Sequence, residues 1–360
     1  MTTSLLPANA DSISLAADLL AGGEIVALPT ETVYGLAADA LRPDAAVKIF
    51  EAKERPFFDP LIVHLPSRDW MEKITDIPPE SRPLVEALIE KFWPGPLTLV
   101  LPRREIVPDI VTSGLDTVAV RMSAHPVFRD VISQVGKPLA APSANRFGHI
   151  SPTAAEHVFT ELRERIPLIV DGGATLHGIE STIVAVEGES LRLLRAGPIT
   201  AEQLGEAWQQ LCMAQKKLLT EAEVNAFFTN LGVSFSALLR GEQRTRIEAP
   251  GQLQSHYAPQ TPLRILELGA HARVFDSTRA GYLAWQKAPS ENCFCEIEIL
   301  SKTGDLHEAA ATLFAKLRNL DSANLDVIFA DAVPETGLGI AIMDRLRKAA
   351  AKGFATDEHV

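Results

Sequence analysis

The chain has 360 residues, of which 46% are hydrophobic, and usual domain sizes favour two domains for this length. Its formal net charge of -12 argues against broad affinity for nucleic acid, because that affinity comes mainly from Lys and Arg side chains that neutralise phosphates. Three cysteines, Cys212, Cys293 and Cys295, are too few for a disulfide framework or a structural zinc site and indicate a reducing compartment.

The N-terminal segment opens an α/β pattern. No basic stretch precedes an apolar one, and no later apolar run approaches the ~20 residues that cross a membrane, so we expect a cytoplasmic protein without membrane contact. Apolar residues at helical spacing over residues 13–20 predict a helix that ends at Gly22. EIVALP (residues 24–29) then predicts a buried strand, and PTETVYGL (residues 29–36) predicts a loop.

The same alternation continues to about residue 205. Helices are predicted for SRPLVEALIEKFW (residues 81–93) and HPVFRDVISQVG (residues 125–136). Strands are predicted, in chain order, for PLIVHL, PLTLVL, TVAVRM, PLAAPS, PLIVDGG, STIVAV and LRLLR. Most of these strands end in loops rich in Pro, Ser, Thr or Gly, and α/β proteins usually build their sites at such strand ends. We therefore assign residues 1–205 to one α/β domain.

A linker and a second domain are predicted to follow. Residues 200–246 are predicted to be helical and charged, and EAPGQLQSHYAPQTP (residues 248–262) irregular because of its Pro, Gly and Gln content. We place the linker at residues 206–262. Strands and helices alternate again over residues 263–360, from PLRILEL to GIAIMDRLRKAAAKG, which predicts a small parallel sheet flanked by helices.

Four basic residues are the first candidates for a functional site. Lys53 and Arg55 stand two apart in an expected loop before the strand that ends at His64. Arg121 and Arg195 each end an apolar run, where a structural arginine is uncommon. A single Lys-x-Arg pair is often only a solvated charged loop. Together, however, the planar fork of arginine and the compact charge of lysine suit a triphosphate, so we expect the four side chains to converge on one cleft.

Hydroxyl-rich loops are the second group, and their polar residues are Thr30, Thr32, Ser143, Asn145, Ser151, Ser181 and Thr182. Such groups hydrogen-bond phosphates and carboxylates without carrying charge. Each also suits a turn or cap, and Ser151 is interpreted both as a helix cap and as a ligand. His64 suits a structural role or the orientation of a carboxylate. The chain has no P-loop, complete dinucleotide fingerprint, Gly-x-Ser-x-Gly or His-Glu-x-x-His motif, so any ATP would bind without a P-loop.

These motifs, in chain order, resemble the YrdC-like catalytic domain: PTETVYGLAADA, AKERPFFDPLIVH, FWPGPLTLVL, VAVRMSAHP, PLAAPSANRFGHISPT, DGG, GIESTIV and LLRAGPIT. With the HYAP linker and the second domain, the chain resembles the long, two-domain form of threonylcarbamoyl-AMP synthases. The resemblance spans residues 12–200 and is weaker over residues 263–350. It implies a twisted mixed sheet with flanking helices, followed by a linker and a small Rossmann-like α/β domain.

The resemblance also implies an activity. Members of the family condense threonine, bicarbonate and ATP into threonylcarbamoyl-adenylate and diphosphate. The same substrates are implied here, with Mg²⁺ accompanying ATP and no metal held by the protein alone. A downstream threonylcarbamoyl transferase complex would then modify tRNA, and no stable direct binding of tRNA is expected. By position in the motifs, the threonine side of the site would be Thr32, His64, Arg121, Ala141 and Ser181. The ATP side would be Lys53, Arg55, Asp59, Thr117, Ser143, Ser151, Arg195 and Tyr257, with Lys53 and Arg55 catalytic.

The HYAP segment is expected to act as a lid. Tyr257 would reach back onto the nucleotide, and closure would exclude water from an intermediate that hydrolyses readily. Some positions depart from the family pattern. Asp59 stands where Asn is frequent, RAGPIT replaces a commoner Arg-Pro-Gly-Ala, and residues 211–246 enlarge the stretch before the linker.

Two other functions stay open. A carbamoyltransferase of the hydrogenase-maturation type shares the YrdC-like domain, but those chains add zinc-finger and acylphosphatase-like regions that three scattered cysteines do not support. A non-catalytic RNA-binding YrdC-like protein would use the cationic concavity for a phosphate backbone. The acidic balance and the lack of interleaved aromatic and basic residues count against it.

Overall fold

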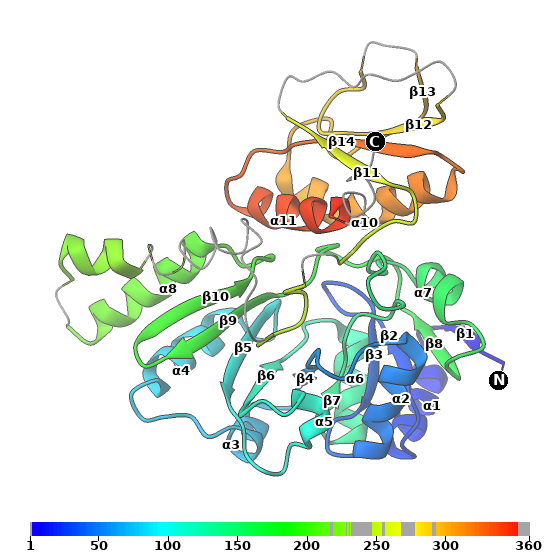
Figure 1. The fold of residues 1–360 in the computed structure, drawn as a ribbon. Helices are drawn as coiled ribbons and strands as arrows, with labels where there is room; N and C mark the ends of the chain where they lie inside the picture. Colours follow the sequence, from blue (N-terminus) through cyan, green and yellow to red (C-terminus); the bar gives the residue numbers. More distant parts are fainter. Residues whose placement is uncertain are drawn as a thin grey trace.

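The computed structural model describes residues 2–216, 219–227, 229, 231, 247–253, 256–267, 278–289 and 293–351. The described residues form two β-sheets with helices packed on them (Figure 1). Residues 232–246 of the predicted charged helical stretch lie outside the described residues, as does the end of the predicted last helix beyond residue 351.

The larger sheet has ten strands, many of which are not neighbours in sequence. Its spatial order is β1 (Ser4–Pro7), β8 (Leu168–Asp171), β2 (Val26–Leu28), β3 (Gly35–Asp39), β7 (Leu139–Ala140), β4 (Ile62–His64), β6 (Thr117–Arg121), β5 (Leu97–Pro102), β9 (Thr182–Glu187) and β10 (Ser190–Arg195). The pairs β1/β8, β8/β2, β4/β6 and β5/β9 are parallel. The other pairs are antiparallel, which confirms the predicted mixed sheet.

Helices cover the larger sheet (Figure 1). They are α1 (Ala10–Ala21), α2 (Pro43–Lys53), α3 (Met71–Ile74), α4 (Arg82–Phe92), α5 (Asp109–Thr112), α6 (Pro126–Val135), α7 (Ala155–Leu162) and α8 (Ala201–Ala214), with a 3₁₀ turn η1 at Arg68–Trp70. The predicted periodicity of α1 is confirmed, because Ala16 and Leu20 are buried and pack with Phe128 and Ile132 of α6. The helix begins where the Asn9 side chain accepts the backbone N–H of Ser12.

Two elements near the candidate site differ from the sequence prediction. Strand β3 (Gly35–Asp39) begins in the last two residues of the predicted loop, residues 29–36, and continues beyond it. Its small residues are buried between β2 and β7, and the sheet overrides their low strand propensity. Lys53 is the last residue of helix α2 and does not lie in a loop as predicted. Pro43 starts this helix, and Glu54 ends it in the left-handed conformation with a φ of 54°.

The smaller sheet has four parallel strands in the order β11 (Leu263–Leu266), β14 (Val327–Asp331), β12 (Ala280–Ala284) and β13 (Phe294–Ile299). Helices α10 (Leu306–Ser322) and α11 (Leu338–Ala350) lie between this sheet and the larger one in Figure 1. This arrangement confirms the predicted small parallel sheet with helices. The sequence prediction missed β12, whose Ala and Gly residues carry a weak strand signal.

The predicted linker, residues 206–262, includes the end of helix α8 and the helical residues 221–227. Its described residues 247–253 and 256–262, which include the HYAP segment, contain no helix or strand. They nevertheless include buried side chains, among them His256 and Tyr257. The three cysteines form no disulfide. Within the part of the chain that the structure describes, no helix combines the length and apolar character needed to cross a bilayer.

Candidate active site

One pocket in the larger domain gathers most of the residues predicted from the sequence. Those that line it are Thr32, Arg55, His64, Arg121, Ala141, Ser143, Ser181, Arg195 and Tyr257. Lys53, Asp59, Thr117 and Ser151 are not among the lining residues. Three of the four expected basic groups therefore converge on one pocket, and the fourth lies behind its wall.

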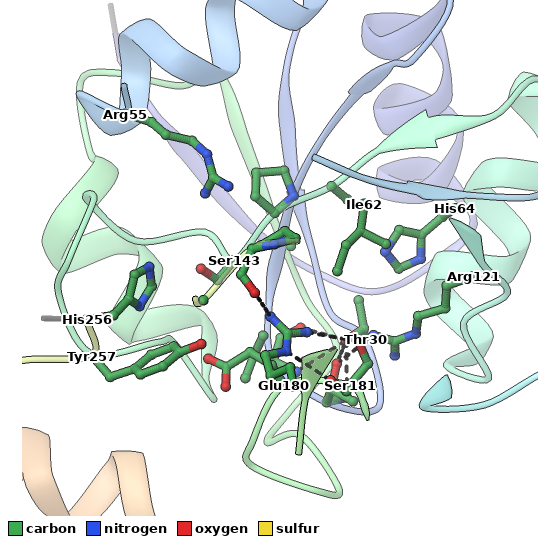
Figure 2. A pocket seen from close by; sticks show the side chains of 18 residues that line it. Thr30, Arg55, Ile62, His64, Arg121, Ser143, Glu180, Ser181, His256 and Tyr257 are labelled. Atoms are coloured by element: carbon green, nitrogen blue, oxygen red, sulfur yellow. Dashed lines mark hydrogen bonds between the residues drawn. The ribbon is translucent and has the colours of Figure 1, made fainter. Parts of the chain in front are cut away.

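The pocket has a cationic group at each end (Figure 2). Arg55 and Tyr257 lie on one side in this view, and His64 and Arg121 lie on the other. Strand β4 connects the two ends, because Arg55 Nη2 donates to the carbonyl of Pro60 just before the strand, at 2.9 Å, and His64 ends it. His64 pairs in parallel register with Arg121 of β6. Guanidinium groups at two separate positions suit a ligand that carries more than one anionic group.

Arg55 is buried and held by its own loop. Its Nη2 lies 2.8 Å from Asp59 Oδ2, and its Nε donates to the Asp59 carbonyl at 3.1 Å. Burial lowers the pKa of the Arg55 guanidinium and raises the pKa of the Asp59 carboxyl. Asp59, which does not line the pocket, thus offsets the positive charge of Arg55. Thr117 starts β6. Two residues further along this strand, Ala119 pairs with Ile62, which lines the pocket.

Lys53 supports the pocket wall. Its Nζ donates to the backbone carbonyls of Ser143 and Asn145, and its side chain is buried. Burial, reinforced by the nearby Arg55 charge, lowers the pKa of Lys53 to about 7. The lysine therefore ties the end of α2 to the loop that presents Ser143 to the pocket. This arrangement resembles a structural brace more than an exposed phosphate ligand.

Arg121 is held by an acidic residue that the sequence analysis did not single out. Its Nη2 lies 2.5 Å from Glu31 Oε1, and its Nη1 donates to Thr32 Oγ1 at 3.1 Å. Burial alone would raise the pKa of Glu31, but Arg121 and a hydrogen bond from Ser123 lower it to about 2. Glu31 is therefore ionised and fixes the guanidinium. An acid between two threonines in PTET was the available sequence signal.

His64 is a neutral imidazole at the same end of the pocket. Its ring lies 4.6 Å from the ring of Phe128, and Nδ1 has no hydrogen-bond partner among the described residues. Burial and the Arg121 charge lower the pKa of His64 to about 3. One ring nitrogen can thus donate a hydrogen bond and the other can accept one, without adding charge.

Ser181 and Arg195 join two strands to the linker. Arg195 donates from Nε to the Ser181 carbonyl and from Nη2 to Ser181 Oγ, both at 3.0 Å. The same hydroxyl lies 2.8 Å from Thr98 Oγ1 of β5. Arg195 Nη1 also donates to the Pro250 carbonyl at 3.4 Å. Arg195 thereby orients a pocket hydroxyl and anchors the linker.

Ser151 does not cap a helix. Helix α7 begins at Ala155, and its N-cap residue, Ala154, makes no side-chain cap. Ser151 Oγ instead donates to Glu180, a carboxylate in the pocket wall. The other Glu180 oxygen accepts a hydrogen bond from Arg345 Nε of α11 at 2.9 Å. The expected cap was wrong because the chain between Ser151 and the helix is too long, and because Glu180 offers a charged acceptor.

The linker closes one side of the pocket. Tyr257 is buried with a φ of 60°, and its hydroxyl has no hydrogen-bond partner among the described residues. Lys348 of α11 donates to the Gly251 carbonyl at 2.8 Å, and the backbone N–H of Ala258 donates to Gly148 at 2.8 Å. With the linker in this position, about 40 Å³ of space remains inside the pocket. That space is far too small for a nucleotide, because ligand pockets usually measure about 300 to 1,000 Å³.

Comparison with known proteins adds the family. A family model described as telomere recombination matches residues 18–197, and a model described as the C-terminal domain of threonylcarbamoyl-AMP synthase matches residues 199–351. Threonylcarbamoyl-AMP synthase of Bacillus subtilis strain 168 is 39% identical over 357 residues, which cover 97% of this chain and 95% of the relative. The chain belongs to the threonylcarbamoyl-AMP synthase family.

Other members of the family agree with this assignment. Threonylcarbamoyl-AMP synthase of Pyrococcus abyssi is 38% identical over 344 residues, covering 94% of this chain and 93% of that protein. The crystal structure of P. abyssi Sua5 complexed with L-threonine superposes with a TM-score of 0.82 at 35% identity, covering 98% of each chain. The predicted family, the two-domain α/β architecture and the enzyme class, a nucleotidyltransferase, are confirmed. The RNA-binding module and the hydrogenase-maturation enzyme are therefore set aside.

Proposed function

We propose that the chain condenses L-threonine, bicarbonate and ATP into threonylcarbamoyl-adenylate and diphosphate, at the pocket described above. The observation that carries this proposal is the convergence of three buried guanidinium groups, Arg55, Arg121 and Arg195, on one pocket. Their nearby carboxylates balance only part of this charge, and a buried cation without an anionic partner is costly. A triphosphate and an amino-acid carboxylate would supply the missing negative charge.

The chemistry divides between the two ends of the pocket. The amino nitrogen of threonine attacks the carbon of bicarbonate, and water leaves, which forms a carbamate. A carbamate oxygen then attacks the α-phosphorus of ATP, and the bond to the β-phosphate breaks to release diphosphate. Because the protein forms no covalent bond with the substrates in this scheme, its catalytic contribution consists mainly of positioning the substrates and neutralising their charge. We assign Arg55 and Arg195 to the nucleotide and Arg121 to the threonine carboxylate.

The remaining predicted residues take supporting roles in this proposal. Lys53 places Ser143, and Asp59 sets the charge of Arg55, through the contacts described above. His64, being neutral, contributes a hydrogen bond without competing with Arg121 for the carboxylate. Ser181 presents a hydroxyl whose direction Arg195 controls.

Mg²⁺ is expected to enter with ATP. Among the residues that the structure describes, no group of three His, Cys, Asp or Glu side chains could hold a metal ion. Glu180 is the one carboxylate among the described lining residues, and Ser143 and Ser181 add hydroxyls. This donor set fits Mg²⁺, which commonly takes one or two protein carboxylates together with phosphate oxygens. The ion would neutralise phosphate charge during displacement.

The linker would act as the predicted lid. The residual space of about 40 Å³ excludes a nucleotide, so Pro250, Gly251, His256 and Tyr257 must move before ATP enters. Closure would then exclude water from threonylcarbamoyl-adenylate, and reopening would release it. The contacts of Lys348 and Arg195 with linker carbonyls define the closed position.

The proposed reaction is tested by the identity of the product. Purified protein is incubated with ATP, L-threonine and carbon-labelled bicarbonate, and the nucleotide product is analysed by mass spectrometry. We expect threonylcarbamoyl-adenylate that carries the label, together with released diphosphate. If diphosphate release continues when threonine or bicarbonate is left out, the proposal of this specific reaction is contradicted.

Two substitutions test the nucleotide side. We expect Arg55→Ala, which removes a cation of the pocket, and Lys53→Ala, which removes the brace of Ser143, each to lose most adenylation, at least about 100-fold, while the fold persists. Lys48→Ala is a matched control, because Lys48 lies on the same helix and forms a half-exposed pair with Glu24. Near-normal turnover in both test variants, measured by diphosphate release, would contradict the assignment of this end of the pocket.

We further expect the product to pass to a threonylcarbamoyl transferase complex that modifies tRNA. The net charge of -12 supports the absence of stable tRNA binding by this chain. The expected cytoplasmic location remains a prediction.

A further inference from the structure

A second cavity lies between the two domains, next to the linker segment that closes the candidate active site. Its walls come from residues 146–150, helix α7, the linker and helix α10. His256 and Tyr257 line the active-site pocket, whereas Ala258 and Gln260 line this cavity. The cavity contains about 540 Å³ of space, and ligand pockets, which often form at domain interfaces, usually measure about 300 to 1,000 Å³. It is therefore large enough for a small-molecule ligand.

The carboxylates of this cavity already have hydrogen-bond donors. One oxygen of Glu161 accepts from the Arg318 guanidinium at 2.5 Å, and the other accepts from the backbone N–H of Arg146 at 2.9 Å. Asp321 accepts from the backbone N–H groups of residues 260 and 261, at 3.1 and 2.8 Å. Neither carboxylate therefore needs a donor from a ligand.

The two arginines of the cavity keep free donors. Arg318 uses Nη2 for both of its contacts, with the Ile150 carbonyl and with Glu161. Arg146 uses Nη2 for Glu54, at 2.5 Å. The Nη1 group of each arginine has no hydrogen-bond partner among the described residues, and neither has the Nε group. An anionic ligand would give these guanidinium groups acceptors.

A neutral histidine adds another donor. The backbone N–H of Thr153 donates to His157 Nδ1 at 3.2 Å, so the hydrogen of the neutral ring lies on Nε2. Burial and the Arg318 charge lower the pKa of His157 to about 4, so the ring is neutral near pH 7. Of the described residues that line the cavity, only Ile150 and Ala258 are apolar. The cavity thus suits a polar ligand that is rich in acceptors.

We propose that this cavity binds a small molecule that carries a phosphate group, and that the ligand contacts both Arg146 of the larger domain and Arg318 of the second domain. Phosphate oxygens are acceptors, and the planar fork of arginine suits them. A ligand that contacts both domains would also hold the linker between them in its closed position. The inference does not depend on the proposed reaction, because the cavity shares no lining residue with the active-site pocket.

Calorimetric titration tests the cavity with three probes: inorganic phosphate, inorganic diphosphate and AMP. We expect at least one probe to bind, and Arg146→Gln and Arg318→Gln each to weaken that binding by about 10-fold or more. Arg165→Gln is the matched control, because Arg165 also pairs with Glu54, at 2.7 Å, but does not line the cavity. Its affinity should stay within about twofold of wild type. Equal affinity for phosphate and AMP would show recognition of the anion alone, and tighter binding of AMP would show added contacts with the nucleoside.

A variant of the active-site pocket separates the two sites. Arg55→Ala should keep the affinity for the probe within about twofold, because Arg55 does not line the cavity. Binding that is lost in Arg55→Ala but retained in Arg146→Gln would place the probe in the active-site pocket and overturn the inference, as would the failure of all three probes to bind. Arg146 is half-exposed, so Arg146→Gln decides the matter if Arg318→Gln, which leaves Glu161 without its cation, does not fold.

Hydrogen exchange tests the contact with both domains. Exchange of the linker amides over residues 256–262, measured by mass spectrometry, should slow by about threefold or more when the probe binds to the wild type. No such slowing is expected in Arg146→Gln at the same probe concentration. Binding that leaves the exchange of these amides unchanged would overturn the proposed contact across the linker.

Discussion

Arg345 in the second domain donates a hydrogen bond from Nε to Glu180 in the first domain across 2.9 Å, with both side chains buried. Glu180 lies in the pocket wall, and its other oxygen accepts a hydrogen bond from Ser151. Arg345 Nη1 also contacts Asp344 at 2.7 Å. The second domain thus contributes directly to the electrostatics of the pocket, although none of its described helices or strands lines it.

Removing this arginine should destabilise the protein. Arg345→Met leaves Glu180 buried without its cation, and we expect the free energy of unfolding to fall by about 3 kcal/mol, measured by urea denaturation. Arg347→Met is the matched control, because Arg347 pairs with Glu335 on the exposed face of the same helix and should change stability by less than about 1 kcal/mol. Adding Glu180→Gln to Arg345→Met should recover part of the loss. Equal effects of the two single substitutions would contradict this role.

Gly178 allows the loop that carries Glu180 to approach helix α10. A Cβ at this position would lie 2.3 Å from the Ala311 carbonyl oxygen, and its φ is +67°. We expect Gly178→Ala to lower the free energy of unfolding by about 2 to 3 kcal/mol and to reduce adenylation, because the helix backbone cannot yield. Gly173→Ala is the control. Its φ is +83° but a Cβ there meets nothing within 4 Å, so only about 1 kcal/mol of backbone strain is expected. Similar losses in both variants would argue against a close interdomain contact.

Glu31 should make stability depend on pH in the acid range. The pKa of Glu31 is lowered from 4.5 to about 2 in the folded protein, so its contribution is complete above about pH 4.5 and is lost as pH falls towards 2. This shift corresponds to about 3 kcal/mol. The difference in unfolding free energy between wild type and Glu31→Gln should therefore be larger at pH 6 than at pH 3. Glu86→Gln, which removes an exposed carboxylate, is the control. If the difference in unfolding free energy between wild type and Glu31→Gln does not change with pH, the ion pair with Arg121 does not stabilise the ionised form of Glu31.

Tyr257 offers a test of the lid with two substitutions. Tyr257→Phe keeps the ring, which stacks 5.7 Å from Phe314 and lies 5.2 Å from the Arg345 guanidinium, and removes a hydroxyl that has no partner among the described residues. We expect its unfolding free energy to stay within about 1 kcal/mol of wild type, while ATP affinity falls by about fivefold because the hydroxyl is free to bond the nucleotide. Tyr257→Ala should weaken ATP binding further and shorten the lifetime of the intermediate. ATP affinity and intermediate lifetime unchanged in Tyr257→Ala would count against a lid.

Local pattern predicted much of the larger sheet because its strands are short apolar runs bounded by turn residues. β4, β5, β6 and β9 were all recognised in this way. Arg121 and Arg195 directly end such runs, and α/β proteins usually build their sites at strand ends, so the sequence could predict that both residues reach one pocket. Strand β3 was not predicted, because its burial comes from the neighbouring strands and not from its own composition.

The amino-acid sequence by itself determined the family, the alternation of helices and strands, and the chemical types that meet in the pocket, because these depend on local spacing and on motifs. Only the tertiary structure decided which side chains face the ligand and which stand behind them. Lys53 turns towards backbone carbonyls, and Glu180 meets an arginine 165 positions away in sequence. The physical reason is that a buried charge must find a partner in space, and the partner's distance along the chain leaves no local pattern.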